Sequence, residues 1–92
     1  MTDEELLEVF RNPDTQRNAF NMLVKKYQQK VYWLIRKMVI DHEDSDDLTQ
    51  EVFIKAWSSL ENFRGDSKLY TWLYRIATNE ALNFLNKKRK RF

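Results

Sequence analysis

The sequence has no cysteine and only one glycine, one proline and one histidine. The lack of cysteine excludes disulfides, thiolate metal sites and thiol nucleophiles. Because hairpin turns depend on glycine and proline, their scarcity argues against β-structure. Charged residues interrupt every apolar run and the amino terminus is acidic, so neither a transmembrane helix nor a secretory signal is expected. These absences predict an all-α protein in the cytoplasm.

The residues that most enzymes need are also missing. His42 has no nucleophile beside it and no ligands at metal spacing, so we place it in a solvent-exposed loop. There is no glycine-rich phosphate loop, and the acidic stretch 41–51 lacks the alternating spacing and the glycine of a calcium loop. We therefore predict no catalytic residue, no metal site and no cofactor, and favour binding as the class of function.

The chain does have enough apolar material for one modest core. It has 92 residues, of which 42% are hydrophobic, and three are tryptophans, so a single domain over residues 1–92 is predicted. The net charge of +2 hides a separation along the chain. Residues 1–63 contain eight basic and twelve acidic residues, whereas residues 64–92 contain eight basic and two acidic ones. This separation suits two partners, a basic or amide-rich protein surface and a polyanion.

Helical periodicity predicts a small bundle of three to four helices. Thr2 and Glu5 form a capping box for a short first helix, which ends at Asn12-Pro13. Asp14 and Thr15 then open a long second helix, the expected centre of the core. Its apolar stripe consists of Phe20, Leu23, Val24, Tyr27, Val31, Leu34, Ile35 and Met38.

A third helix is predicted from about Asp46 to Leu60. We assign Phe53 and Trp57 to its buried side, together with the apolar positions Leu48, Val52, Ala56 and Leu60. Another face carries an isoleucine among carboxylates and an amide, which is more typical of a docking surface than of a solvated face. The residues of this face are Asp47, Gln50, Glu51 and Ile54.

The last third of the chain reads as a loop with Gly65, a helix and a basic run. Asp66 or Ser67 can cap this helix, and its buried stripe would be Leu69, Leu73, Ile76 and Ala77. Its other face carries cations and amides close to Tyr70 and Tyr74, which suits phosphates, stacked bases and base edges of single-stranded nucleic acid. A solvated helix face with a basic tail remains the alternative. The stripe on this face is Arg75, Asn79, Asn83, Asn86 and Lys90.

Two long motifs, DDLTQEVFIKAW at residues 46–57 and FRGDSKLYTWLYRIATNEALNFL at residues 63–85, together resemble region 2 of bacterial RNA polymerase sigma factors of the extracytoplasmic-function (ECF) group. The similarity covers nearly the whole chain. It implies a sigma-2-like helical fold and a transcription initiation factor domain. Such a domain docks on the clamp helices of the largest polymerase subunit and recognises and helps melt the promoter −10 element.

The resemblance also implies roles for individual residues. The polymerase contacts would be Asp47, Gln50, Glu51 and Ile54. One non-template base would flip into a pocket beneath the loop, lined by Ser59, Phe63, Ile76 and Asn79. The strand itself would be held by Arg64, Ser67, Lys68, Tyr70, Thr71, Arg75 and Asn83.

Family members also carry a second domain, region 4, after a linker. Here that linker would begin after the basic tail 87–92, which we expect to fray without a polyanion nearby. The chain is then either an excised domain or a minimal protein, and the end in a basic run favours an excised domain. An anti-sigma factor is a further expected partner. Two alternatives remain open, a helical protein-interaction module and a bundle that binds nucleic acid without sequence preference. A membrane-surface role for the last helix is the weakest reading, since its stripe carries asparagines more than lysines.

Overall fold

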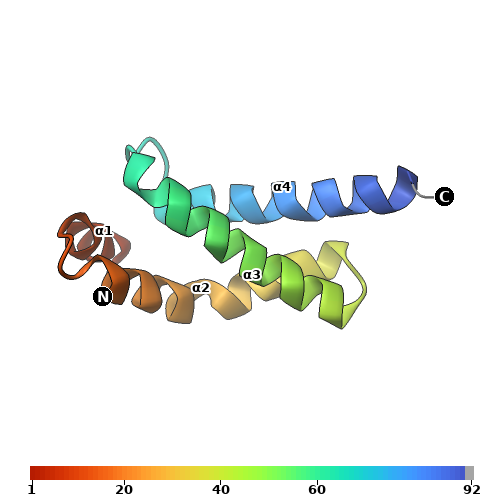
Figure 1. Ribbon diagram of the computed structural model, residues 1–92, viewed down its shortest axis with the longest axis horizontal. Coiled ribbons are helices and arrows are strands. Elements are labelled where there is room, and N and C mark those ends of the chain that lie inside the picture. Colours follow the sequence, from red (N-terminus) through yellow and green to blue (C-terminus); the bar gives the residue numbers. More distant parts are fainter. Residues whose placement is uncertain (91–92) are drawn as a thin grey trace.

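The computed structural model describes residues 1–90, and within them it contains four α-helices and no strand, which confirms the predicted all-α bundle (Figure 1). A single turn of 3-10 helix, Leu60–Asn62, extends the third α-helix into the loop. Arg91 and Phe92, the last two residues of the predicted basic tail, lie outside the described residues. The α-helices are α1 (Asp3–Arg11), α2 (Gln16–Met38), α3 (His42–Ser59) and α4 (Leu69–Lys90).

The first helix begins and ends where the sequence predicts. The Thr2 hydroxyl accepts from the Glu5 backbone N–H at 3.2 Å, and the Glu5 carboxylate accepts from the Thr2 N–H at 3.2 Å, which completes the capping box. Asn12 is extended, and the chain turns at Pro13 into α2. Thr15 holds this turn by donating from its hydroxyl to the Val9 carbonyl at 2.7 Å.

The third helix begins at His42, four residues before the predicted start. Asp41 is its N-cap and accepts from the Asp44 N–H at 2.9 Å, while the fully buried Ser45 donates to the carbonyl oxygens of Val39 and Asp41. These bonds satisfy the polar groups of the first turn, so the acidic stretch forms a helix start rather than a loop. The placement of His42 in a loop is therefore wrong, although its side chain is exposed as expected.

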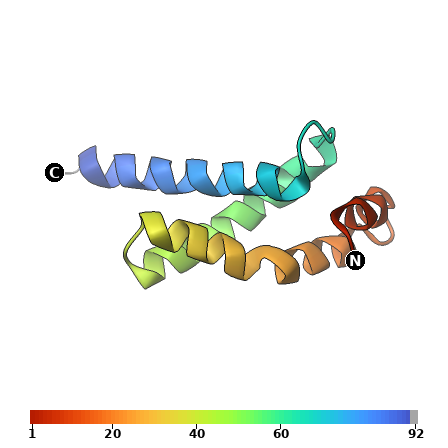
Figure 2. The same cartoon turned by 180° about the vertical axis from the view of Figure 1, so that it is seen from behind.

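The two long helices α2 and α4 lie side by side, and α3 crosses them diagonally (Figures 1 and 2). The molecule is elongated, with extents of 47 × 22 × 20 Å. The core forms where the three helices meet, and its fully buried side chains are Leu23, Val31, Ile35, Val52, Ala56, Leu73, Ala77 and Ala81.

The fourth helix continues through Lys90, so the basic run is helical as far as the structure describes it, and its fraying without a polyanion stays a prediction. Lys87, Lys88, Arg89 and Lys90 lie in the last turn, where cations interact favourably with the carbonyl end of the helix dipole. The predicted buried stripe is confirmed at Leu69, Leu73 and Ala77, while Ile76 is only half-buried.

Gly65, in the loop before α4, has a positive φ of 79°. A Cβ atom there would meet no neighbouring atom within 4 Å, so a substitution is opposed by backbone strain alone. We expect Gly65→Ala to lower the free energy of unfolding by about 1 kcal/mol and Gly65→Asn by less, because asparagine tolerates this conformation. Urea denaturation of both variants tests this. An alanine variant as stable as the wild type would contradict the loop conformation.

Candidate nucleic-acid interface and docking surface

The exposed side of α4 presents the cationic and amide stripe predicted from the sequence. Arg75, Asn79 and Asn83 are all exposed, and we call them the strand face. Asn86 and Lys90 continue the row toward the end of the helix and are exposed as well. Because Leu73, Ala77 and Ala81 are buried on the opposite side, the stripe is free to contact a ligand along its length.

The loop between α3 and α4 carries further predicted contacts. Phe63 is half-buried and packs against Trp72, with 5.3 Å between the ring centroids. Lys68 and Tyr70 are exposed, and the Lys68 ammonium lies 6.0 Å from the centre of the Tyr70 ring. Tyr70 in turn meets Tyr74 edge to face at 5.7 Å. The start of α4 thus offers flat rings beside a cation. The other predicted residues here are Arg64, which is exposed, and Ser59, Ser67, Thr71 and Ile76, which are half-buried.

A hollow of about 470 Å³ lies beside this loop, and we call it the loop hollow. Phe63, Ser67, Lys68 and Tyr70 line one side of it, as members of the predicted site. Ser59, Ile76 and Asn79, predicted to share a pocket with Phe63, are not among its lining residues. The remaining walls come from α1 and its N-cap, from α2, and from the loop and the first residue of α4, and the sequence did not suggest them. These residues are Thr2, Asp3, Glu4, Leu7, Lys26, Gly65 and Leu69.

One carboxylate in the first turn of α1 is hydrogen-bonded to α2. Tyr27 donates from its hydroxyl to Asp3 Oδ2 at 2.6 Å, and Lys26 donates to Asp3 Oδ1 at 2.7 Å. Burial raises the pKa of Asp3, but the hydrogen bonds from Lys26 and Tyr27 outweigh this and hold that pKa below its ordinary value. The stabilisation is therefore present at neutral pH and is lost as the pH falls through the lowered pKa. Burial, followed by the bond to Asp3, raises the pKa of Tyr27, so its hydroxyl remains a donor.

The four predicted polymerase contacts lie together on the outer side of α3. Asp47, Gln50, Glu51 and Ile54 are all exposed, and 61% of the Ile54 surface is accessible. Such exposure of a large apolar side chain among polar neighbours is typical of a contact surface.

An open groove of about 580 Å³ runs beside Ile54 between α2 and α3, and we call it the docking groove. The assignment of Trp57 to the core is wrong, because 40% of its surface is exposed and it forms one wall of this groove. Its ring packs edge to face on Phe20 and Phe10, at centroid distances of 5.0 and 6.0 Å. Phe53 is buried as predicted. The full lining is Phe20, Val24, Gln28, Asp46, Thr49, Gln50, Phe53, Ile54 and Trp57.

The spacing of Ile54 and Trp57 could have revealed this groove. Residues three apart share a helix face, so an exposed Ile54 implies that Trp57 is at least partly exposed too. The contribution of Phe20 and Val24 from α2 could not have been found in this way, because it depends on the packing of two helices.

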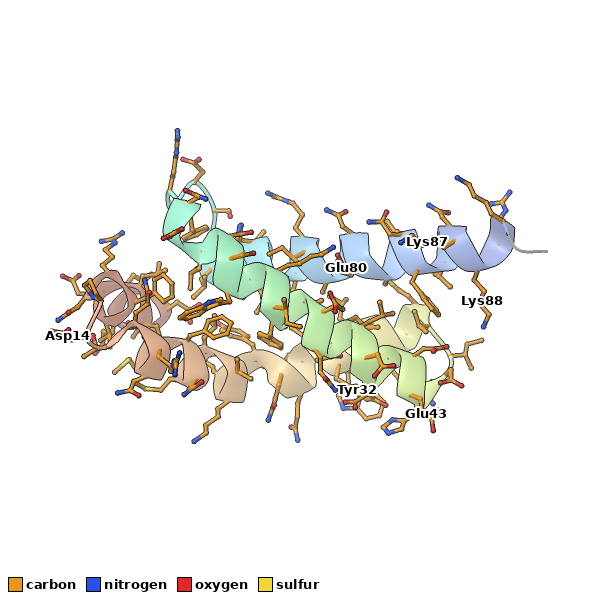
Figure 3. All side chains as sticks on the ribbon, in the orientation of Figure 1. Asp14, Tyr32, Glu43, Glu80, Lys87 and Lys88 are labelled. Atoms are coloured by element: carbon orange, nitrogen blue, oxygen red, sulfur yellow. The ribbon has the colours of Figure 1, made fainter. Side chains whose placement is uncertain are left out.

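A second aromatic cluster at the far end of α2 was not predicted. Tyr32 packs edge to face against Trp33 and against His42, and its hydroxyl is hydrogen-bonded to His42 Nδ1. Tyr32 and the neighbouring Glu43 both lie at the end where α2 meets α3 (Figure 3). No group of three or more histidine or acidic side chains within residues 1–90 is placed to hold a metal ion.

An ion pair joins α3 to α4. Lys55 on α3 and Glu80 on α4 form a salt bridge, and Glu80 is labelled in Figure 3. The hydrogen bond to Glu80 raises the pKa of Lys55 above its ordinary value. Glu80 is not among the residues that line the loop hollow. The pair therefore offers a charged contact of the same kind as the Asp3 contact at a different place in the fold.

The fold and its surfaces define a small helical domain with a cationic amide stripe on α4, an acidic outer side of α3 and a mostly apolar groove between α2 and α3. The family model described as sigma-70 region 2 matches residues 23–91, and the chain belongs to this family. Within residues 1–90, none of the helices combines the length and apolar character needed to cross a membrane.

Curated relatives agree with this assignment. The chain is 51% identical over 83 residues to the RNA polymerase sigma-H factor of Pseudomonas aeruginosa, covering 90% of this chain and 42% of that protein. It is 47% identical over 91 residues to the ECF RNA polymerase sigma-E factor of Haemophilus influenzae, covering 99% of this chain and 47% of that protein. The sigma-E factor of Escherichia coli K12 is 49% identical to the chain over 85 residues, and the match covers 92% of this chain and 43% of that protein. The chain thus spans less than half the length of these relatives.

A solved structure shares the fold. It is the NMR structure of an engineered region 2 of sigmaE in complex with GTAAAA. The TM-score is 0.84 with 42% sequence identity, and the match covers all of this chain and 94% of that one. The sigma-2-like bundle expected from the motifs is therefore confirmed.

Proposed function

We propose that this chain is a transcription initiation domain that docks on the clamp helices of RNA polymerase and recognises the promoter −10 element as it melts. The observation that carries the proposal is the placement of an exposed arginine and amide row on α4 in a fold whose relative forms a complex with GTAAAA. The role is one of binding, without catalysis, in the cytoplasm where the polymerase acts.

The strand face accounts for binding of the non-template strand. Arg75 neutralises phosphates, and Asn79 and Asn83 present amides that can donate to and accept from base edges. Tyr70 adds an exposed ring for stacking, which holds a base whatever its identity. Phosphate contacts fix the position of the strand, whereas the amides distinguish its sequence.

The docking groove accounts for polymerase binding. Ile54 and Trp57 provide an apolar centre, Gln50 lines the groove beside them, and Asp47 and Glu51 are exposed on the same helix. An apolar centre with a polar rim is the usual arrangement of a protein interface. The acidic rim selects a partner surface that carries basic or amide side chains.

Asn79→Ala tests the base-reading role. The variant should lose the preference for one base at one position of a −10-like oligonucleotide, a discrimination of about 1–3 kcal/mol, because its amide no longer pairs with the base edge. Weak binding to a scrambled oligonucleotide should remain, since phosphate contacts supply it. The measurement is fluorescence anisotropy with GTAAAA and its single-base variants, at one fixed salt concentration.

Asn21→Ala is the matched control, because it removes the same amide from an exposed position on α2, outside the stripe on α4. It should bind with the wild-type preference. If Asn79→Ala weakened every sequence equally, the residue would not read a base. Binding by the wild type that ignores sequence and disappears in salt would favour a non-specific bundle instead.

A further inference from the structure

The Lys55–Glu80 ion pair joins two residues whose charges differ from those of the rest of their helices. α3 carries five acidic residues and one lysine, Lys55, and it has no arginine. α4 carries five lysines or arginines and one acidic residue, Glu80. The only lysine of α3 thus forms its salt bridge with the only acidic residue of α4. This salt bridge neutralises the one lysine that α3 could offer to a nucleic acid.

The ion pair lies beside residues that are predicted to contact the DNA strand. Glu80 directly follows Asn79 on α4. Ser59 comes four residues after Lys55, so these two side chains share a face of α3. Asn79 and Ser59 both belong to the predicted base pocket, one from each helix. A strand bound there would therefore bring its phosphates close to Lys55.

The two partners differ in exposure, and Lys55 is the outer one. The Lys55 side chain is 52% exposed, whereas the Glu80 side chain is only 12% exposed. An ammonium group has three donors, and Glu80 is the one hydrogen-bond acceptor that Lys55 has within residues 1–90. Solvent can thus reach the ammonium group, and so can a phosphate.

Glu80 competes with a phosphate for this ammonium group. Both are anionic acceptors, and each forms a charge-assisted hydrogen bond with a lysine. If Lys55 turned from Glu80 to the DNA, it would leave a largely buried carboxylate without its partner. An unpaired buried charge is costly, so the carboxylate opposes any contact between Lys55 and the strand.

We propose that Lys55 is a further phosphate-binding residue of the strand site and that Glu80 masks it, which means that Glu80 keeps the ammonium group from the DNA. The mask lowers affinity for every strand alike, because phosphate contacts carry no sequence information. Binding then depends more heavily on the amides of the strand face. This inference rests on the proposed function and adds to it a masked contact on α3, since neither Lys55 nor Glu80 is among the predicted strand contacts.

A double-mutant cycle of Glu80→Gln and Lys55→Met tests the mask. Removing a carboxylate raises affinity for DNA through electrostatics alone, whatever Lys55 does. That general effect persists in the Lys55→Met background, whereas release of the mask requires the lysine. The two effects are therefore separated by comparing Glu80→Gln in the two backgrounds. Glu43→Gln is the matched control for net charge, because Glu43 is exposed in the first turn of α3, far along the helix from Ser59.

Binding is measured by fluorescence anisotropy with GTAAAA and with a scrambled oligonucleotide, at several salt concentrations. Glu80→Gln should bind both about tenfold more tightly than the wild type, the effect of one additional charge-assisted hydrogen bond. The slope of log K against log salt should become steeper by about 0.7, the contribution of one phosphate contact on a single strand. In the Lys55→Met background, the same substitution should change affinity less than about twofold, because only a screened charge effect remains. Glu43→Gln should bind as the wild type does.

The outcomes separate this inference from the proposed function. Absence of a gain from Glu80→Gln, or an equal gain in both backgrounds, would overturn the mask while a wild-type preference for GTAAAA upholds the proposed function. An unchanged salt slope would overturn the mask as well. A wild type that binds GTAAAA and the scrambled sequence equally would instead overturn the proposed function. Circular dichroism checks that each variant is folded, and Glu80→Ala takes the place of Glu80→Gln if that variant is not.

Discussion

Leu73→Ala should lower the free energy of unfolding by about 3 kcal/mol, the largest effect on stability that we expect from a single side chain here. Leu73 is fully buried on the side of α4 that packs against α2 and α3. Truncation removes its apolar contacts and leaves a cavity that the three helices cannot close, because each is held by its own buried residues. A domain of this size is stable by only about 5–15 kcal/mol, so the variant approaches the unfolding threshold.

Urea denaturation followed by circular dichroism measures this effect. Leu82→Ala is the control, since Leu82 lies on the same helix and 46% of its surface is exposed. It should cost less than about 1 kcal/mol, because surface positions contribute little. Equal losses in the two variants would mean that α4 does not pack through the face that contains Leu73.

Ile54→Asp should weaken binding to a clamp-helix fragment of the largest polymerase subunit by more than about tenfold, because a charge replaces the apolar centre of the docking groove. The stability of the domain should change little, since most of the Ile54 surface is exposed. The added carboxylate also lies within an already acidic surface, so it does not remove the attraction for a basic partner. A loss of affinity therefore reports on apolar contact.

Calorimetric titration of the fragment into each variant provides the test. Ile40→Asp is the matched control, because Ile40 is 85% exposed and lies outside the docking groove. It should bind the fragment as the wild type does. Unaltered binding by Ile54→Asp would place the polymerase contact elsewhere on the domain.

Patterns within one helix predicted the fold well. The capping box at Thr2 and the stripe of α4 at Leu69, Leu73 and Ala77 depend only on residues three or four apart, and these are confirmed. The start of α3 was missed because an acidic run reads equally well as a loop. It is a helix because Asp41 and Ser45 form hydrogen bonds with the polar groups of its first turn. These bonds can be recognised only when the backbone conformation is known.

The grooves and hollows that two or more elements line together could not be predicted from the sequence. Trp57 looked like a core residue because it is large and apolar, yet nothing covers its outer side in the described part of the chain. α1, which lines the loop hollow, packs on α2 through the buried Leu6 and Phe10 and is bonded to it by the contact of Asp3 with Tyr27, residues 24 positions apart. Contacts between residues so far apart leave no recognisable pattern in the local sequence. The individual roles proposed for the strand face and the acidic side of α3 remain predictions.

The crossing of α3 over α4 has a mechanical consequence. Ala56 on α3 and Ala77 and Ala81 on α4 are fully buried, and small side chains let packed helices approach toward the short end of the usual 8–10 Å separation of their axes. One surface of the domain faces outward from α3 and the other from α4. A polymerase held by the first and a DNA strand held by the second would be separated by little more than these two helices. The domain would then act as a rigid spacer, and a shift of α3 against its partner would be passed directly to the strand.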